Sequence, residues 1–132
     1  MTTNYVNTFI AVSPDSTAPQ GTEPKPGSVA ALQFALLRER PYGYTSDELL
    51  FEVHAVRSGF SDADRSNDRD AFFAKARACL RASPLVKQHG WGLHHDAQSR
   101  VAAYDVHTDN YRRLAADAGL RQTQGMRNKR SR

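Results

Sequence analysis

The sequence predicts an α+β fold: a mostly antiparallel sheet of about four strands with two or three helices packed on one face. Three observations lead to this class. Apolar residues recur at helical spacing over 29–39, residues 91–95 alternate as in a strand, and the predicted elements follow the order β-α-β-α-β-β-α. A chain of 132 residues is long enough for one such domain, which we assign to residues 1–120.

The first part of the chain is expected to hold a strand, a loop and a helix. Residues 7–12 form an apolar, β-prone run that ends at a turn signal. Residues 13–27 contain four prolines and two glycines, which predicts a loop or lid rather than a helix or strand. Ser28 is positioned to cap a helix over 29–39, and Pro41 stops that helix.

The middle of the chain is expected to add a second strand and a second helix. Residues 48–58 alternate between an apolar set and a mixed set, which predicts a strand that ends at Gly59; the alternative is a helix capped by Ser46. Ser61, followed three residues later by an acid, predicts the start of a helix over 62–78. Cys79 continues the apolar stripe of that helix.

The last part of the chain is expected to contain a hairpin, a helix and a basic tail. Residues 91–95 and 100–106 flank a turn and predict a β-hairpin, and Gly92 leaves one face bare for a helix, another backbone or a ligand. Residues 109–118 predict the last helix. Residues 121–132 hold five basic residues and no acid, so we expect a disordered tail.

Composition and charge exclude several classes of protein. The formal net charge is +4, but without the tail the body has 13 basic and 14 acidic residues. Nucleic acid is therefore expected to bind only weakly and nonspecifically, through the tail. No run reaches the roughly 18 apolar residues of a membrane helix, and no secretory signal is present, so we expect a cytoplasmic protein with no membrane partner.

The segment CLRASPLVKQHGWGLHHD, residues 79–96, gathers the single cysteine, the single tryptophan and three of the five histidines. Cys79 with His94 as its base would form a nucleophile–base pair; a buried, unreactive thiol is the alternative. Arg81 and Lys87 could together clamp a carboxylate or phosphate, or could simply lie on the surface.

Glu52 and His54 are predicted to project side by side from the mixed face of the second strand. They would form a general acid/base pair, or else a half-exposed sheet face. His94 and His95 point to opposite faces of a strand and cannot chelate one ion without distortion. Because the sequence also lacks metal and cofactor motifs, we predict no metal and no cofactor.

The predicted site therefore has a catalytic set and a ligand-binding set. The catalytic candidates are Cys79, His94, Glu52 and His54. The ligand-binding candidates are Arg81, Ser83, Lys87, Trp91 and Tyr44. The loop of residues 13–27 and the connector PYGY are expected to close over the pocket.

Several stretches of the chain resemble a family of small bacterial proteins known as a domain of unknown function. The stretches are NYVNTFIAV, LQFALL, PYGYTSDELLFEV, FFAKARACLRASPLVKQHGWGLHHD and AAYDV. The most specific part is the motif Cys-Leu-Arg-x-Ser-Pro-Leu-x-Lys-x-x-Gly-Trp-Gly-x-His-His, and the resemblance extends from Asn4 to Leu114. The family has tyrosine where this chain has His89, so the resemblance removes His89 from the site. The resemblance implies no activity.

The leading interpretation is a protein that binds a small anionic molecule in a pocket beside the sheet. The first alternative is a small enzyme, in a biosynthetic pathway, that uses Cys79 or the Glu52 and His54 pair. The second alternative is an interaction or nucleic-acid-associated protein that acts through its basic tail. A homodimer formed through a free sheet edge or through the tryptophan hairpin is a further expectation.

Overall fold

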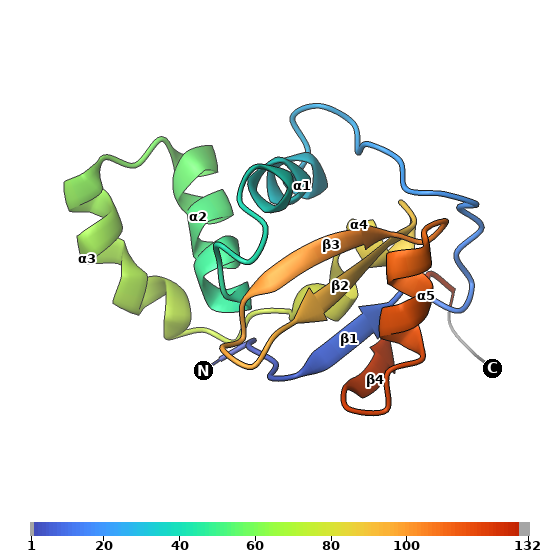
Figure 1. Ribbon diagram of the computed structural model, residues 1–132. Coiled ribbons are helices and arrows are strands. Elements are labelled where there is room, and N and C mark those ends of the chain that lie inside the picture. Colours follow the sequence, from blue (N-terminus) through green and yellow to red (C-terminus); the bar gives the residue numbers. More distant parts are fainter. Residues whose placement is uncertain (1, 130–132) are drawn as a thin grey trace.

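The centre of the protein is a four-stranded mixed sheet with the strand order β3-β2-β1-β4. A computed structural model describes residues 2–129 of the chain (Figure 1). The strands are β1 (Thr8–Ala11), β2 (Trp91–His95), β3 (Val101–Asp105) and β4 (Arg121–Gln124). The hairpin strands β2 and β3 are antiparallel, β1 is antiparallel to β2, and β4 is parallel to β1. The α+β class is confirmed, whereas the prediction of a mostly antiparallel sheet is wrong.

Strand β4 comes from the basic segment for which we expected disorder. Its backbone pairs with β1 in parallel register, and the N–H of Arg121 donates to the carbonyl of Asn7 at 2.8 Å. The sequence RQTQ has no apolar alternation because three of these four residues are exposed on an edge strand. The prediction of disorder is therefore wrong for residues 121–124, and its last part, residues 130–132, lies outside the described residues.

The helices are more numerous than predicted and lie on both faces of the sheet. They are α1 (Val29–Glu39), α2 (Ser46–Ser58), α3 (Asp62–Phe73), η1 (Leu80–Ala82), α4 (Pro84–Lys87) and α5 (Asp109–Ala115). Phe34 of α1 packs on Trp91, on one face of β2. Tyr111 of α5 packs edge-on against Phe9 of β1, on the other face, and Figure 1 shows α5 standing well apart from α1 and α2.

The bare face of the hairpin is filled by α5. A Cβ atom on Gly92 would lie 2.5 Å from Cζ of Phe9 and 2.6 Å from Cε2 of Tyr111. Real Cβ atoms do not approach other atoms so closely, so glycine is what lets this helix reach the sheet. A ligand therefore has no room beside Gly92, and the expected pocket on this strip of the hairpin does not exist.

The segment predicted as a second strand is helix α2. Thr45 forms a capping box with Glu48, and Gly59 ends the helix in the left-handed conformation with φ of 67°. The alternating pattern arises because two sides of the helix are buried. Leu49 faces the main core, while Phe51 belongs to a second cluster with α3. Burial on two sides imitates the period of a strand, which misled the sequence prediction.

Helix α3 ends at Phe73, five residues before the predicted end. Beyond it, the guanidinium of Arg77 lies 3.9 Å from the ring centroid of Phe72, and its Nε donates to the carbonyl of Phe72 at 2.9 Å. The chain then continues in irregular structure to Cys79. The prediction that Cys79 extends the apolar stripe of this helix is therefore wrong.

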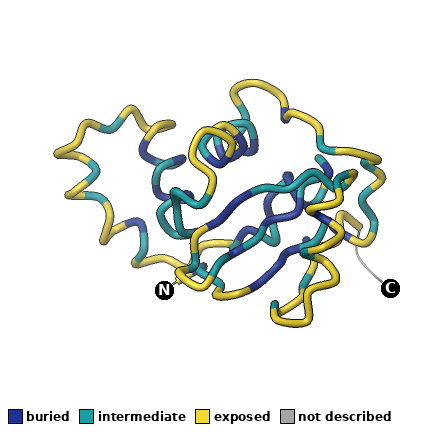
Figure 2. Tube along the Cα trace, viewed as in Figure 1, coloured by how far each residue is buried: buried dark blue, intermediate teal, exposed yellow. Residues whose placement is uncertain are grey.

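The main core lies between the sheet and the helices α1, α2 and α4. Figure 2 shows buried backbone along the inner strands and along the sides of α1 and α2 that face the sheet, whereas most of α3 is exposed. The fully buried apolar residues of this core include Ile10, Leu37, Leu49, Leu80, Leu85 and Leu93. Helix α3 packs through this smaller second cluster, with Phe51 and Ala55 of α2, rather than through the main core.

Candidate functional site

Cys79 and His94 have different neighbours in the structure. The Sγ atom of Cys79 lies 3.2 Å from the hydroxyl oxygen of Tyr5, in the N-terminal segment. The Nδ1 atom of His94 lies 2.7 Å from the hydroxyl oxygen of Tyr42. Among residues 2–129 no contact joins the thiol to an imidazole, so the predicted nucleophile–base pair is not assembled.

The polar residues of the segment after Cys79 hold the fold together. The Nε atom of Arg81 donates to the carbonyl of Gln124 in β4 at 2.6 Å. The hydroxyl of Ser83 caps α4 and donates to the side chain of Gln33 at 2.6 Å. The carbonyl of Lys87 accepts from the side chain of Asn128 at 2.8 Å. Arg81 and Ser83 are thus directed to two different partners rather than to a common anion, and the contact of Lys87 is made by its backbone carbonyl.

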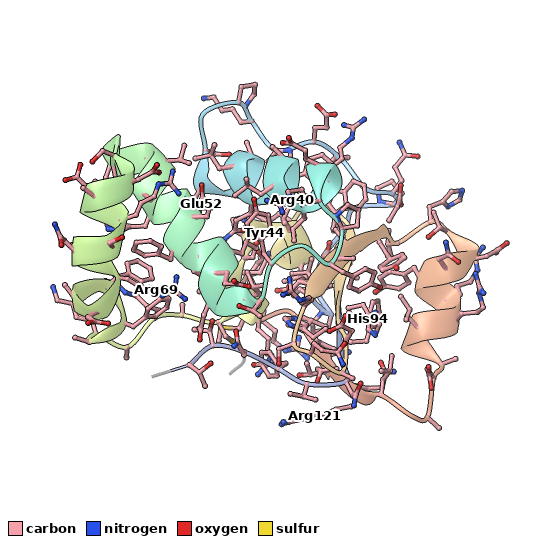
Figure 3. The ribbon with its side chains drawn as sticks, turned by 60° about the vertical axis from the view of Figure 1, so that its left-hand side comes forward. Arg40, Tyr44, Glu52, Arg69, His94 and Arg121 are labelled. Carbon is pink, nitrogen blue, oxygen red and sulfur yellow. The ribbon has the colours of Figure 1, made fainter. Side chains whose placement is uncertain are left out.

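Glu52 and His54 do not form a pair, because they are two residues apart on a helix. Glu52 pairs with Arg65, and Nε2 of His54 lies 3.0 Å from Oδ2 of Asp68. Both partners belong to α3, so these two contacts attach that helix to α2. The predicted neighbourhood of Glu52 and His54 is therefore wrong, and Figure 3 shows Glu52 far from His94.

Two adjoining cavities lie between the proline-rich loop, α1 and the hairpin. The first, here called the Trp91 cavity, has a volume of about 460 Å³, and the second has a volume of about 540 Å³. They share Glu23, Phe34 and Arg38. The other residues that line the Trp91 cavity are Gly21, Leu37, Pro41, Trp91 and Ala103.

The wall of the Trp91 cavity is held by the proline-rich loop. The indole N–H of Trp91 donates to the carbonyl of Thr22 at 2.8 Å. A Cβ atom on Gly21 would lie 2.6 Å from Cζ2 of that indole, so the loop passes directly against the ring. The N–H of Gly21 also donates to the carboxylate of Asp105 at 2.8 Å. This part of the loop is therefore built onto the hairpin.

Neither tyrosine of the PYGY connector lines this cavity. The ring of Tyr44 packs against the main core, with the guanidinium of Arg40 5.4 Å from its centroid (Figure 3). Pro41 is the connector residue that lines the Trp91 cavity. The ligand-binding candidates Trp91 and Tyr44 are thus separated.

A second constellation lies on the face of the sheet that α5 covers. The hydroxyl oxygen of Tyr42 is 2.7 Å from Nδ1 of His94 and 2.6 Å from the hydroxyl oxygen of Tyr104. Tyr42 adopts the left-handed conformation with φ of 58°, which is uncommon for a bulky residue. Backbone strain of this kind gathers at functional sites.

The electrostatics of this constellation favour a neutral histidine. Burial lowers the pKa of His94, while the carboxylates of Asp96 and Asp117 act in the opposite direction. Burial and the hydrogen bond with Tyr104 raise the pKa of Tyr42. A cavity of about 310 Å³ lies next to this group, and here it is called the Tyr104 cavity. Its lining residues are Tyr104, Asn110, Arg113, Leu114 and Asp117.

His95 of β2 is a buried histidine whose side chain has no hydrogen bonds among the described residues. Its side chain is fully buried, and within residues 2–129 neither ring nitrogen has a hydrogen-bond partner. Its ring packs edge-on against Tyr5, with 5.3 Å between the centroids. The same described residues contain no group of three or more histidine, cysteine, aspartate or glutamate side chains that could hold a metal ion.

These features define a small α+β protein with a mixed sheet. A cavity lies on the face of the sheet that α1 covers, and a hydrogen-bonded tyrosine–histidine group lies on the face that α5 covers. No helix within residues 2–129 is long and apolar enough to span a membrane. The chain belongs to DUF6157, a family of unknown function, whose model matches residues 1–131. Membership of a family of unknown function is thereby confirmed. No curated protein and no solved structure matches the chain.

The sequence analysis missed most of the residues that line the Trp91 cavity and the Tyr104 cavity. Phe34 and Arg38 lie within the predicted helix 29–39, where they read as one more apolar position and one more surface charge. Tyr104 and Arg113 lie in the predicted hairpin and last helix without any motif. One residue of the PYGY connector could have indicated the second site. This residue is Tyr42, which joins His94 to Tyr104.

Proposed function

We propose that the protein binds a small molecule with a flat apolar body and one acidic group in the Trp91 cavity. The observation that carries this proposal is the aromatic wall of Trp91 and Phe34, whose ring centroids are 4.8 Å apart. Sites for small molecules are concave and mainly apolar, with a few polar groups that fix the orientation of the ligand. The Trp91 cavity has this character.

Arg38 is the group that would receive the acid. Its guanidinium lies 5.9 Å from the ring centroid of Phe34, at the edge of the aromatic wall. Its Nη1 atom lies 2.8 Å from the carboxylate of Glu23, and the two side chains are 68% and 72% exposed. An exposed ion pair contributes only about 0–1 kcal/mol. A ligand carboxylate can therefore replace Glu23 at Arg38 with little loss.

The preformed wall adds to this proposal. The loop is fixed to the hairpin by the hydrogen bonds of Gly21 and Trp91, so little backbone ordering is needed when a ligand enters. The second cavity continues the same surface past Pro24 and Pro26. This continuation leaves room for the part of a ligand that lies beyond Phe34.

The proposal is tested by NMR titration of ¹⁵N-labelled protein with phenylacetate and with phenylacetamide. The chain has one tryptophan, so the indole N–H gives one side-chain signal at the cavity wall. We expect this signal and the amides of Gly21 and Phe34 to shift until saturation. Phenylacetate should bind about fivefold more tightly than phenylacetamide, which corresponds to about 1 kcal/mol.

Matched arginine variants separate the role of Arg38 from general charge. Arg38→Gln should bind both probes equally, because the acid then has no partner. Arg57→Gln changes an exposed arginine on α2 outside the cavity and should keep the preference for phenylacetate. Shifts that avoid the indole and the amide of Gly21, or no saturation at all, would contradict the proposed site.

A further inference from the structure

The tyrosine–histidine group joins a half-buried base to the Tyr104 cavity. The hydroxyl group of Tyr42 has one proton but two hydrogen-bond partners, Nδ1 of His94 and the hydroxyl oxygen of Tyr104. It therefore donates to one partner and accepts from the other. When Nδ1 of His94 carries no proton, Tyr42 donates to the imidazole and Tyr104 donates to Tyr42. With Nδ1 protonated, the direction of both hydrogen bonds is reversed.

We infer that Tyr104, Tyr42 and His94 form a proton relay that removes a proton from a small acidic hydroxyl compound bound in the Tyr104 cavity. This site lies on the face of the sheet opposite the Trp91 cavity and does not depend on the function proposed for that cavity. Tyr104 lines the cavity and so is the group that touches the ligand. His94 is the terminal base.

The step moves three protons and leaves every atom accounted for. The O–H bond of the ligand breaks, and its proton goes to the hydroxyl oxygen of Tyr104. The proton of Tyr104 passes to Tyr42, and the proton of Tyr42 forms the N–H bond at Nδ1 of His94. The ligand becomes an anion and His94 becomes an imidazolium, so no oxidant, reductant or metal is required.

The charges around the relay suit this transfer. Arg113 and Asp117 both line the cavity, so the anion that forms lies beside a cation as well as a carboxylate. The titratable groups that face His94 are Tyr42 from the connector, Asp96 at the end of β2 and Asp117 after α5. Burial keeps the imidazole neutral before the step, and the two carboxylates stabilise the imidazolium afterwards.

Helix α5 and the strained turn hold the relay in place. The N–H of Tyr42 donates to the carbonyl of Val101 at 2.9 Å, which fixes the connector to the edge of β3. Asn110 and Arg113 are joined by a side-chain hydrogen bond on the helix, at the mouth of the cavity. The base, the two relay tyrosines and the cation thus come from four segments: β2, the PYGY connector, β3 and α5.

The experiment uses 4-nitrophenol as the probe, because its absorption spectrum reports directly whether it is ionised. The full chain is titrated with this phenol between pH 5 and pH 8. We expect bound probe to ionise at a pH at least one unit lower than free probe, a tenfold change in its acidity. In parallel, the NMR signals of the His94 imidazole should show protonation as the probe binds.

Four variants and one control distinguish a relay from a merely structural role. Tyr104→Phe, Tyr42→Phe and His94→Gln should each abolish the change in acidity, and Arg113→Gln should reduce it. Arg112→Gln alters the neighbouring arginine, which pairs with Asp109 outside the cavity, and should behave like the wild type. Circular dichroism establishes that each variant is folded, and Tyr104→Phe replaces Tyr42→Phe if the strained turn does not tolerate the latter.

Several results overturn the relay. The first is a wild-type protein that does not bind the probe, or binds it without changing its acidity. The second is a folded Tyr42→Phe or Tyr104→Phe protein that keeps the wild-type change. The third is a His94 imidazole whose protonation does not respond to the probe. Loss of the change in acidity in Tyr104→Phe, Tyr42→Phe and His94→Gln supports the relay.

Discussion

Replacing the buried His95 by leucine should remove a large part of the loss of stability on acidification. Burial, with a smaller effect from the neighbouring His94, lowers the pKa of His95 from 6.5 to about 4. In the unfolded chain the imidazole takes up a proton below about pH 6.5, whereas in the folded protein it stays neutral down to about pH 4. Between these values the unfolded state binds more protons, so stability falls as the pH falls.

The size of the effect follows from the two pKa values. One pKa unit corresponds to about 1.36 kcal/mol. The difference between 6.5 and about 4 therefore amounts to about 3 kcal/mol lost between neutral pH and pH 4. The group is fully buried, so solvent does not screen this contribution.

Leucine also removes two buried polar atoms that have no partner. Both nitrogens of His95 lack a hydrogen bond within residues 2–129, and an unsatisfied buried polar atom costs about 1–3 kcal/mol. His95→Leu should therefore be at least as stable as the wild type at pH 7.5. It should then exceed the wild type by a further margin of about 3 kcal/mol near pH 4.

Urea unfolding at pH 7.5, 6.5, 5.5 and 4.5, followed by circular dichroism, measures this difference. The fold also lowers the pKa of carboxylates such as Asp15 and Asp47, so their protonation in acid reduces the stability of the protein. This reduction is the same in the wild type and in His95→Leu. The exposed His107→Gln variant is the control and should follow the wild type. Parallel pH profiles for the wild type and His95→Leu would refute the reasoning, because they would mean that His95 does not resist protonation in the fold.

Three further predictions concern packing, capping and the thiol. Gly92→Ala should lower the unfolding free energy by about 1–3 kcal/mol in urea titrations, because its Cβ would press on Phe9; an unchanged value would mean that α5 packs less closely. Thr45→Ala should cost about 1 kcal/mol by removing the hydroxyl that accepts from the N–H of Glu48, and an unaffected melting temperature would deny the capping box. Iodoacetamide should alkylate the partly buried Cys79 more slowly in the native protein than in denaturant; equal rates would show a fully accessible thiol.

Elements that depend on local signals could be predicted well. Ser28 and Pro41 mark the limits of α1, and the residue range 29–39 is the one observed. The hairpin and the start of α5 follow from turn and capping residues in the same way. In these cases a few adjacent residues fix the backbone, so one sequence is sufficient.

The candidate sites could be predicted only in part. Trp91 lines a cavity and the proline-rich loop lies against it, while the role of Trp91 in ligand binding stays a prediction. His94 lies in a polar group, but its hydrogen-bond partner is Tyr42 rather than the predicted cysteine. Tyr42 contacts His94 and Tyr104, which lie 52 and 62 positions away in the chain, and no local pattern records these contacts.

The sequence by itself determined the α+β class, the cap and limits of α1, the hairpin, and the family to which the chain belongs. Only the tertiary structure decided that residues 46–58 are a helix, that residues 121–124 complete the sheet, and that α5 fills the bare side of Gly92. The physical reason is that caps and turns act between neighbours in the chain. Burial, in contrast, depends on what packs on each side of an element, and a helix buried on two sides has the same apolar alternation as a strand.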